Sequence, residues 1–186
     1  TYDGTTSAAA LPTITSGALV GGDTAVLSEI YSNRNAGTGK TLTPAAAITD
    51  GNGGLNYTVT LVNNTTGVIN AAALTVTATG VNRVYDGTAT ATVTLADNRV
   101  AGDVLTLTNT AALFLDKNVG TAKPVSVTGI AVSGTDAANY TLSNATASTA
   151  ANITARPITV TAATNTKTYD GNATALALPT ITSGAL

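Results

Sequence analysis

Most side chains that enzymes use for catalysis are missing from this sequence. Its 186 residues include no His, Cys, Met, Trp or Gln, and Glu29 is the single Glu. Without His and Cys, the commonest general bases, thiol nucleophiles and transition-metal ligands are absent. Ser, Lys and Asp are present but scattered, with no recurrent grouping that resembles a catalytic triad. We therefore expect no catalysis, no cofactor and no bound metal.

Two smaller sets of residues suggest a calcium site and a covalent crosslink, but each is better explained by a structural role. Asp86, Asp103 and Asp116 carry oxygen ligands that suit calcium, but their spacing matches neither an EF-hand loop nor a glycine-rich β-helix repeat. A chelator is accordingly expected to leave the melting temperature unchanged. Lys40 and Lys123 each occur at the end of a recurrent Gly-Thr segment. We expect a surface ion pair with an Asp at each lysine, rather than a covalent Lys–Asn crosslink.

A Tyr-Asp-Gly motif occurs three times, and its residue types favour a turn. Asp accepts hydrogen bonds from nearby backbone N–H groups, Gly supplies a positive φ angle, and the aromatic ring packs on a sheet. We interpret the motif as a structural turn, with a ligand contact as the alternative. Asp23 and Asp103, which follow glycines, are interpreted in the same way. The motif residues are Tyr2, Asp3, Gly4, Tyr85, Asp86, Gly87, Tyr169, Asp170 and Gly171.

The spacing of this motif indicates a tandem repeat. Tyr85 lies 83 residues after Tyr2 and 84 residues before Tyr169. Residues 1–19 return almost unchanged as residues 168–186, which indicates alternating repeats of types A and B. The predicted domains are residues 1–73 (repeat A, lacking its first strand), 74–157 (repeat B) and 158–186 (the start of the next repeat A), called here the first, second and third repeats. Because both ends fall inside a repeat, we expect a slice of a longer protein.

Alternating apolar and Thr residues predict β-strands along the chain. Leu74, Val76 and Ala78 alternate with Thr, and the same period of two recurs in later segments. Frequent Gly, Asn and Asp turns favour antiparallel connections. We predict an all-β fold of tandem small antiparallel β-sandwich-like domains; β-grasp-like units are the alternative if an Ala run at 8–10, 45–47 or 71–73 is helical. The expected core comprises Leu74, Val76, Val93, Leu95, Leu105, Leu107, Phe114, Val125, Val127, Tyr140 and Leu142.

The second and third repeats join without a flexible linker. Pro157 lies between two strand-like segments and biases Arg156 toward extended backbone. Consecutive repeats are therefore expected to be joined end to end as a rod. The first repeat lacks the strand equivalent to 157–162, and its unpaired edge is expected to take a strand from a neighbouring segment of the same chain or of another copy. Residues 161–167 of that neighbour should then lie within bonding reach of Thr1.

Asparagine sequons are frequent and are candidate glycosylation sites. A three-residue signal is weak in a chain so rich in Asn and Thr. The candidate sites are Asn56, Asn64, Asn139, Asn144, Asn152 and Asn172.

Several segments of the second repeat resemble a known family. "VYDGTATATVTL" (84–95), "FLDKNVGTAK" (114–123) and "GTDAANYTL" (134–142) are similar to the YDG-type repeats of large bacterial surface proteins, the filamentous-haemagglutinin-like adhesins exported by two-partner secretion. The first repeat departs from this pattern, because Asn33 stands where the second has Asp116 and "DGNGGLNYTV" replaces "GTDAANYTL". The resemblance implies an extracellular location on the bacterial cell surface and a fibre role, with no catalytic residues.

Composition and charge limit the remaining functions. A net charge of −2 and a pI near 4.7 provide no basic surface for nucleic acid or anionic membrane. No apolar run reaches the roughly 18–20 residues of a membrane span. The leading hypothesis is a structural stalk or spacer of a bacterial extracellular adhesin or surface filament, whose partners are neighbouring repeats of the same chain or fibre. The alternative is an adhesion module that binds a host or cell-surface glycan or protein.

Overall fold

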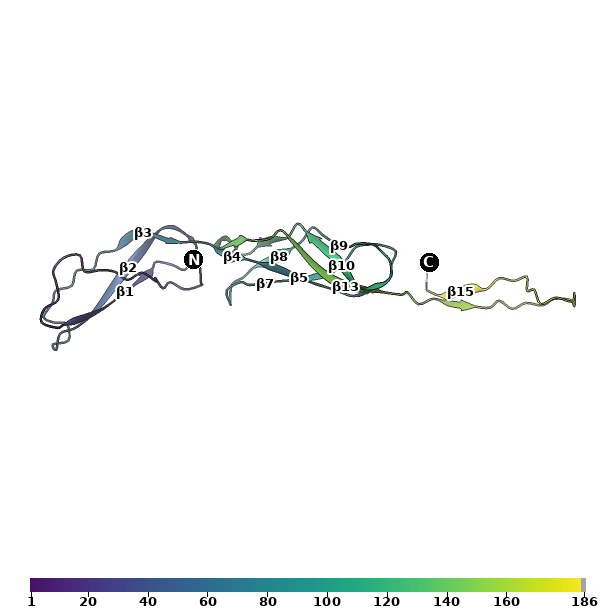
Figure 1. The fold of residues 1–186 in the computed structure, drawn as a ribbon, viewed down its shortest axis with the longest axis horizontal. Helices are drawn as coiled ribbons and strands as arrows, with labels where there is room; N and C mark the ends of the chain where they lie inside the picture. The colour runs from purple at the N-terminus through teal and green to yellow at the C-terminus, as the bar shows by residue number, and fades with distance from the viewer. Residues whose placement is uncertain (185–186) are drawn as a thin grey trace. The chain divides into compact units, whose positions relative to one another are not determined.

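The computed structural model describes residues 1–184, and these residues form strands joined by turns (Figure 1). The all-β prediction is confirmed, because the one helix of the described residues is a single 3-10 turn, η1 (Ala137–Asn139). The strands are β1 (Thr24–Tyr31), β2 (Gly37–Thr49), β3 (Asn64–Ile69), β4 (Ala72–Leu74), β5 (Val76–Gly80), β6 (Arg83–Val84), β7 (Val93–Asp97), β8 (Thr106–Thr108), β9 (Ala111–Phe114), β10 (Gly120–Thr128), β11 (Ala131–Ser133), β12 (Tyr140–Leu142), β13 (Thr146–Thr154), β14 (Thr159–Thr161) and β15 (Thr180–Ser183).

The chain is divided into two compact units that do not follow the sequence repeats. Unit 1 comprises residues 1–77, 96–108 and 130–145, and unit 2 comprises residues 78–95, 109–129 and 146–186, of which 185 and 186 lie outside the described residues. Unit 1 therefore contains the whole of the first repeat together with parts of the second. The boundaries predicted for the repeats come from sequence identity, and they stay predictions.

The first two repeats share a three-stranded scaffold. In the first repeat the sheet has the order β1-β2-β3, with β2 antiparallel to both neighbours. In the second repeat β9, β10 and β13 hold the equivalent places in a sheet of order β6-β13-β10-β9. Backbone bonds also recur: Tyr2 N–H donates to the Asn70 carbonyl at 2.7 Å, and Tyr85 N–H donates to the Thr154 carbonyl at 2.9 Å. The two repeats thus fold alike around their Tyr-Asp-Gly motifs.

Two strand pairs differ from the expected antiparallel arrangement. β4 pairs in parallel with β12, and β6 pairs in parallel with β13. Hairpin turns create antiparallel neighbours, whereas each of these pairs joins residues near the boundary of the first and second repeats to residues about 70 positions later in the chain. The prediction of a purely antiparallel domain is therefore wrong at these two pairs.

The Ala runs are not helical. Residues 45–47 lie in β2, residues 72 and 73 lie in β4, and residues 8–10 belong to neither a helix nor a strand. Alternation with β-branched residues explains the strands, since a pleated surface suits such side chains better than a helix does. The condition attached to the β-grasp alternative is thus not met at these three runs.

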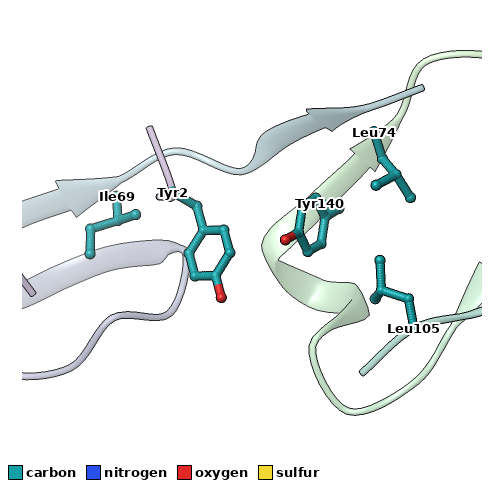
Figure 2. Packing of buried hydrophobic residues seen from close by; sticks show 5 residues of the cluster. All are labelled: Tyr2, Ile69, Leu74, Leu105 and Tyr140. Atoms are coloured by element: carbon teal, nitrogen blue, oxygen red, sulfur yellow. The ribbon is translucent and has the colours of Figure 1, made fainter. Parts of the chain in front are cut away.

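Much of the predicted core is buried. Leu74, Val76, Leu105, Phe114, Val125, Val127 and Tyr140 are buried, whereas Val93, Leu95, Leu107 and Leu142 are half-buried. Further buried apolar residues, which were not predicted, are Tyr2, Ile69, Ala91, Ala112, Ile130, Ala151 and Ile153. One cluster within unit 1 brings Tyr2 and Ile69 of the first repeat together with three residues of the second, Leu74, Leu105 and Tyr140 (Figure 2).

Candidate functional site, a tyrosine-aspartate-arginine cluster

Each Tyr-Asp-Gly motif forms a tight turn held by its Asp. The Asp3 carboxylate accepts hydrogen bonds from Thr5 N–H at 2.8 Å and from the Thr5 hydroxyl at 2.9 Å. Asp86 receives the same pair of bonds from Thr88, both at 2.9 Å. Asp170 accepts from Asn172 N–H at 3.1 Å. The glycines that follow have φ angles of 82°, 83° and 76°, a conformation that strongly favours Gly.

These hydrogen bonds also set the ionisation of the turn aspartates. The bonds from Thr5 lower the pKa of Asp3, and those from Thr88 lower the pKa of Asp86. At Asp170 the first cause of the lowered pKa is the hydrogen bond from Lys167. All three carboxylates are exposed, so their role is local turn formation.

The tyrosines of the motif have three different environments. Tyr2 is 4% exposed, Tyr85 is half-buried and Tyr169 is 93% exposed. A neighbouring part of the fold accounts for the burial of Tyr2, since its hydroxyl donates to the Asp103 carboxylate at 2.8 and 3.0 Å. Gly4 has a matching constraint: a Cβ there would lie 2.7 Å from Val100 Cγ1, whereas Gly87 and Gly171 have open space. The first motif is therefore both a turn and a contact between repeats.

Asp103 is the centre of a polar cluster in unit 1. Its side chain is fully buried and also accepts a hydrogen bond from the Tyr140 hydroxyl at 2.5 Å. Tyr140 in turn accepts from Val100 N–H at 2.8 Å. Arg34 Nη1 lies 3.1 Å from Asp103, so two tyrosines and one arginine satisfy this carboxylate. Two of these three partners, Tyr2 and Arg34, come from the first repeat.

Arg34 extends the cluster to a second aspartate. Its Nη2 donates to Asp136 Oδ1 at 3.0 Å, while Asp136 Oδ2 accepts from Val104 N–H at 2.9 Å. Three residues later, Asn139 Oδ1 accepts from Ala36 N–H at 2.9 Å. A guanidinium that spans two carboxylates fixes direction as well as distance, because its donors are held in one plane.

The electrostatics of the cluster favour a charged Asp103 and neutral tyrosines. Burial alone would raise the pKa of Asp103, but the hydrogen bonds from Tyr140 and Tyr2 and the Arg34 charge together hold it below its usual value. Burial, followed by the hydrogen bond to Asp103, raises the pKa of Tyr2 to about 12. The same two causes raise the pKa of Tyr140. Over the physiological pH range the two tyrosines therefore stay protonated and donate to an ionised carboxylate.

Apolar packing surrounds the polar contacts. The rings of Tyr2 and Tyr140 meet edge to face, with centroids 5.5 Å apart and planes at 78°. Figure 2 shows these rings between Ile69 on one side and Leu74 and Leu105 on the other. Edge-to-face pairs add a modest stabilisation beyond the area they bury. The two hydroxyls thus reach Asp103 from within an apolar cluster.

The sequence interpretation missed this cluster, although one signal for it was present. Asp103 was assigned to a turn, and Arg34 and Asp136 were given no role. However, Gly-Asp and Asn-Tyr recur as a pair, and the structure joins them in both repeats: Tyr57 donates to Asp23 at 2.6 Å as Tyr140 does to Asp103. A paired recurrence of two polar motifs could have indicated that contact.

The other candidate ligands have local partners. Asp86 lies 2.5 Å from Arg83, and Asp116 lies 2.5 Å from Lys123, so the predicted Lys–Asp pair is confirmed at Lys123. At Lys40 the prediction is wrong, because that buried lysine donates to the Asn33 amide oxygen at 2.6 Å. The first repeat has no aspartate at this place. Within residues 1–184 there is no group of three or more acidic, His or Cys side chains that could hold a metal ion.

The sequons differ in how accessible they are. Asn139 is buried, and its amide oxygen is bonded to Ala36 N–H. Asn144 and Asn152 are half-buried and bond to backbone groups of Val76 and Ala122. The exposed candidates are Asn56, Asn64 and Asn172.

Comparison with known proteins identifies one domain in the chain. The YDG domain family matches residues 70–149, so the second repeat contains a YDG domain. No curated protein and no solved structure matches the chain significantly. Within residues 1–184, no helix has the length and apolar character needed to cross a membrane.

Proposed function

We propose that this chain is part of the stalk of a bacterial extracellular adhesin or surface filament, built from tandem β repeats joined end to end as a rod. The observation that carries the proposal is the Asp103 cluster, in which Tyr2 and Arg34 of the first repeat contact Asp103 of the second. Such a contact fixes the geometry between consecutive repeats, which a length-setting spacer requires. The bacterial and extracellular parts of the proposal rest on the resemblance of residues 84–95, 114–123 and 134–142 to surface-protein repeats.

The chemistry of the cluster supports a structural role. A catalytic tyrosine or nucleophile is activated by a lowered pKa or by an adjacent base. Tyr2 has the opposite property, because its pKa is raised to about 12 and its hydroxyl is bound to a charged carboxylate. Both carboxylates bridged by Arg34 also accept bonds from neighbouring groups in the fold. The polar groups of the cluster thus bond to one another and to their neighbours in the fold.

A distance measurement between spin labels tests the rigid joint. The chain has no native Cys, so Thr49→Cys and Ser133→Cys place one label on each repeat at exposed positions within unit 1. We expect double electron–electron resonance to give a single narrow distribution of distances between the two labels. Asp103→Ala should broaden it, and the matched variant Asp23→Ala should leave it narrow. A broad distribution in the otherwise unchanged chain would contradict the proposal.

Two further measurements separate the stalk from the adhesion alternative. Antibody against this chain should label intact cells of the source organism without permeabilisation. The chain should give no specific signal on a glycan array or on host-cell proteins. Specific glycan binding that survives Asp103→Ala would support the adhesion module instead.

A further inference from the structure

Two segments of the chain are joined to each other by parallel pairing. The first, residues 70–85, begins at the boundary of the first and second repeats and is called here the entry segment. The second, residues 140–154, ends the second repeat and is called the exit segment. In unit 1, β4 of the entry segment pairs in parallel with β12 of the exit segment. In unit 2, β6 pairs in parallel with β13. The two pairs therefore follow in the same order along both segments.

Side chains supply hydrogen bonds where the two backbones do not pair. Asn144 binds both polar groups of one backbone residue: its Oδ1 accepts from Val76 N–H at 2.9 Å, and its Nδ2 donates to the Val76 carbonyl at 2.9 Å. Further along, Asn152 N–H donates to Asn82 Oδ1 at 2.7 Å. These amide side chains take the place of backbone bonds, so the entry and exit segments remain connected beyond their short strands.

Close packing accompanies the hydrogen bonds. Gly80 N–H donates to Thr149 Oγ1 at 3.2 Å, and a Cβ at Gly80 would lie 2.6 Å from the Ala150 carbonyl oxygen. A side chain at this position would therefore force the two segments apart. Leu74 of the entry segment is 0% exposed and Ile153 of the exit segment is 1% exposed, so apolar burial shields the pairs from water. Leu74 and Tyr140, from β4 and β12, belong to the same buried cluster (Figure 2).

The direction of pairing determines how these bonds respond to tension along the chain. Such tension reaches the entry segment at its N-terminal end, through residue 70, and the exit segment at its C-terminal end, through residue 155. In a parallel pair these two ends point in opposite directions, so the pull slides one strand along the other and the hydrogen bonds resist together. In an antiparallel pair the same two ends lie side by side, and the bonds would open one after another.

We propose that the entry and exit segments form a shear clamp, which resists mechanical extension of this chain. The clamp consists of the pair β4–β12 in unit 1, the pair β6–β13 in unit 2 and the side-chain bonds of Asn144, Thr149 and Asn82. The source of the tension rests on the proposed stalk, since a stalk transmits the pull on whatever it holds. The shear geometry itself follows from the strand directions alone.

Asn144 is the positioning residue whose effect on the clamp is easiest to isolate. It is half-buried, and its planar amide presents one acceptor and one donor to the same residue, Val76. An alanine at this position would remove both bonds. Resistance to force depends on the barrier to unfolding rather than on the equilibrium stability. Forced unfolding of single molecules is therefore the appropriate measurement.

Two attachment geometries test the clamp on the same strand pair. The chain has no native Cys, so pairs of cysteines can serve as handles. Asn70→Cys with Ala155→Cys loads the segments in shear. Asn70→Cys with Ala138→Cys pulls β4 and β12 apart from the same end, because Ala138 lies just before β12. All three positions are exposed. At equal loading rates we expect the unfolding force to be about twofold or more higher in shear. Equal forces, or a lower force in shear, would overturn the clamp.

Asn144→Ala separates the clamp from a general effect on stability. The variant should unfold at a lower force in the shear geometry. Its force in the second geometry should stay unchanged, because opening there begins at Ala72 and Tyr140, before Val76 is reached. Asn64→Ala is the matched control: it removes two hydrogen bonds from Thr66, which lies outside the loaded residues, and should change neither force. Circular dichroism checks that both variants are folded. Equal weakening of Asn144→Ala in the two geometries would contradict the clamp.

The results of this experiment are separable from those on the proposed function. The handles lie at residues 70, 138 and 155, so the first repeat is not stretched between them. Equal unfolding forces in the two geometries overturn the clamp and leave the rigid Asp103 joint untouched. Conversely, a broad distance distribution in the spin-label experiment contradicts the stalk, while a higher force in shear still supports the clamp.

Discussion

Asp23 and Asp103 are equivalent residues in two repeats, but they have different surroundings. Each follows a Gly and accepts a hydrogen bond from a tyrosine about 35 residues later, Tyr57 or Tyr140. Asp103 has in addition Tyr2 and an ion pair with Arg34. Within residues 1–184, Asp23 has no second tyrosine and no arginine, and it is only half-buried.

The difference indicates which part of the cluster one repeat specifies. The Asp, its tyrosine and the backbone N–H that holds this tyrosine all come from the same repeat. The second tyrosine and the arginine come from the preceding repeat. The polar site of the second repeat is therefore completed by residues of the first repeat, and its Asp103 side chain is removed from water.

The largest expected effect comes from removing the shared carboxylate. Asp103→Ala leaves the buried Tyr2 and Tyr140 hydroxyls without their acceptor and leaves Arg34 with Asp136 alone, and breaking a buried pair in this way costs about 3–5 kcal/mol. We expect about 3 kcal/mol, because Arg34 is partly exposed. Asp23→Ala should cost about 1 kcal/mol, the value of a typical hydrogen bond. Native-state hydrogen exchange in β8 and β11 measures the loss of stability in Asp103→Ala. Exchange in β1 measures the loss in Asp23→Ala.

Acid should remove the stability that the Asp103 carboxylate contributes. The folded-state pKa of Asp103 is lowered, so its contribution to stability is present above the unfolded pKa, near 3.9, and is lost as the pH falls through the folded value. The Asp103→Ala variant should lack this loss. Equal destabilisation by Asp103→Ala and Asp23→Ala would show that the neighbouring repeat adds nothing.

The next effect concerns the strand that follows the joint. Leu74 is fully buried, and replacing such a residue by Ala costs about 2–5 kcal/mol. We expect Leu74→Ala to lower the free energy of unfolding of unit 1 by about 3 kcal/mol. Ile158 is the residue of the third repeat that is equivalent to Leu74, and it is half exposed. Ile158→Ala should therefore lower the free energy of unfolding by about 0.5 kcal/mol or less. Urea denaturation of both variants, followed by tyrosine fluorescence, provides the comparison. A large loss of stability in Ile158→Ala would mean that this side chain is buried in solution.

Local patterning explains what could be predicted. The alternation of Thr with apolar residues predicted strands, and it placed Leu74, Val125 and Val127 in the core correctly because a strand buries every second side chain. The Tyr-Asp-Gly turns involve neighbouring residues, so their hydrogen bonds follow from residue types. Tyr2 was not predicted in the core, because its burial depends on Asp103, 101 residues away. The parallel pairs were missed for the same reason, since no turn joins β4 to β12.

A smaller effect is expected from the hydroxyl of Tyr2. Tyr2→Phe keeps the ring in contact with Tyr140 but removes a donor to a charged acceptor, which costs about 2 kcal/mol. The folded-state pKa of Tyr2 is raised from 10.0 to about 12, so its contribution is complete below pH 10 and is lost as the pH rises toward 12. Tyr2→Phe should therefore reduce the loss of stability in alkali, as measured by circular dichroism. Tyr169→Phe is the control, because Tyr169 is 93% exposed, and it should change neither quantity. Identical alkaline transitions in the two variants would contradict the role of Tyr2.

The smallest expected change in stability comes from the lysine contacts, which differ between the two repeats. Lys123 lies 2.5 Å from the Asp116 carboxylate, while Lys40 donates to the neutral Asn33 amide at 2.6 Å. Asp116 is 45% exposed, so water and salt screen its pair, and Asp116→Asn should lower the stability only slightly in low salt. The cost should disappear in about 1 M salt, where the screening length falls to roughly 3 Å. The reverse change, Asn33→Asp, introduces a carboxylate beside a more buried lysine, so we expect a gain of up to about 1 kcal/mol that salt reduces less. Urea denaturation at low and high salt measures both variants. A salt-independent loss in Asp116→Asn would mean that this pair, like the Asp103 cluster, is held away from water.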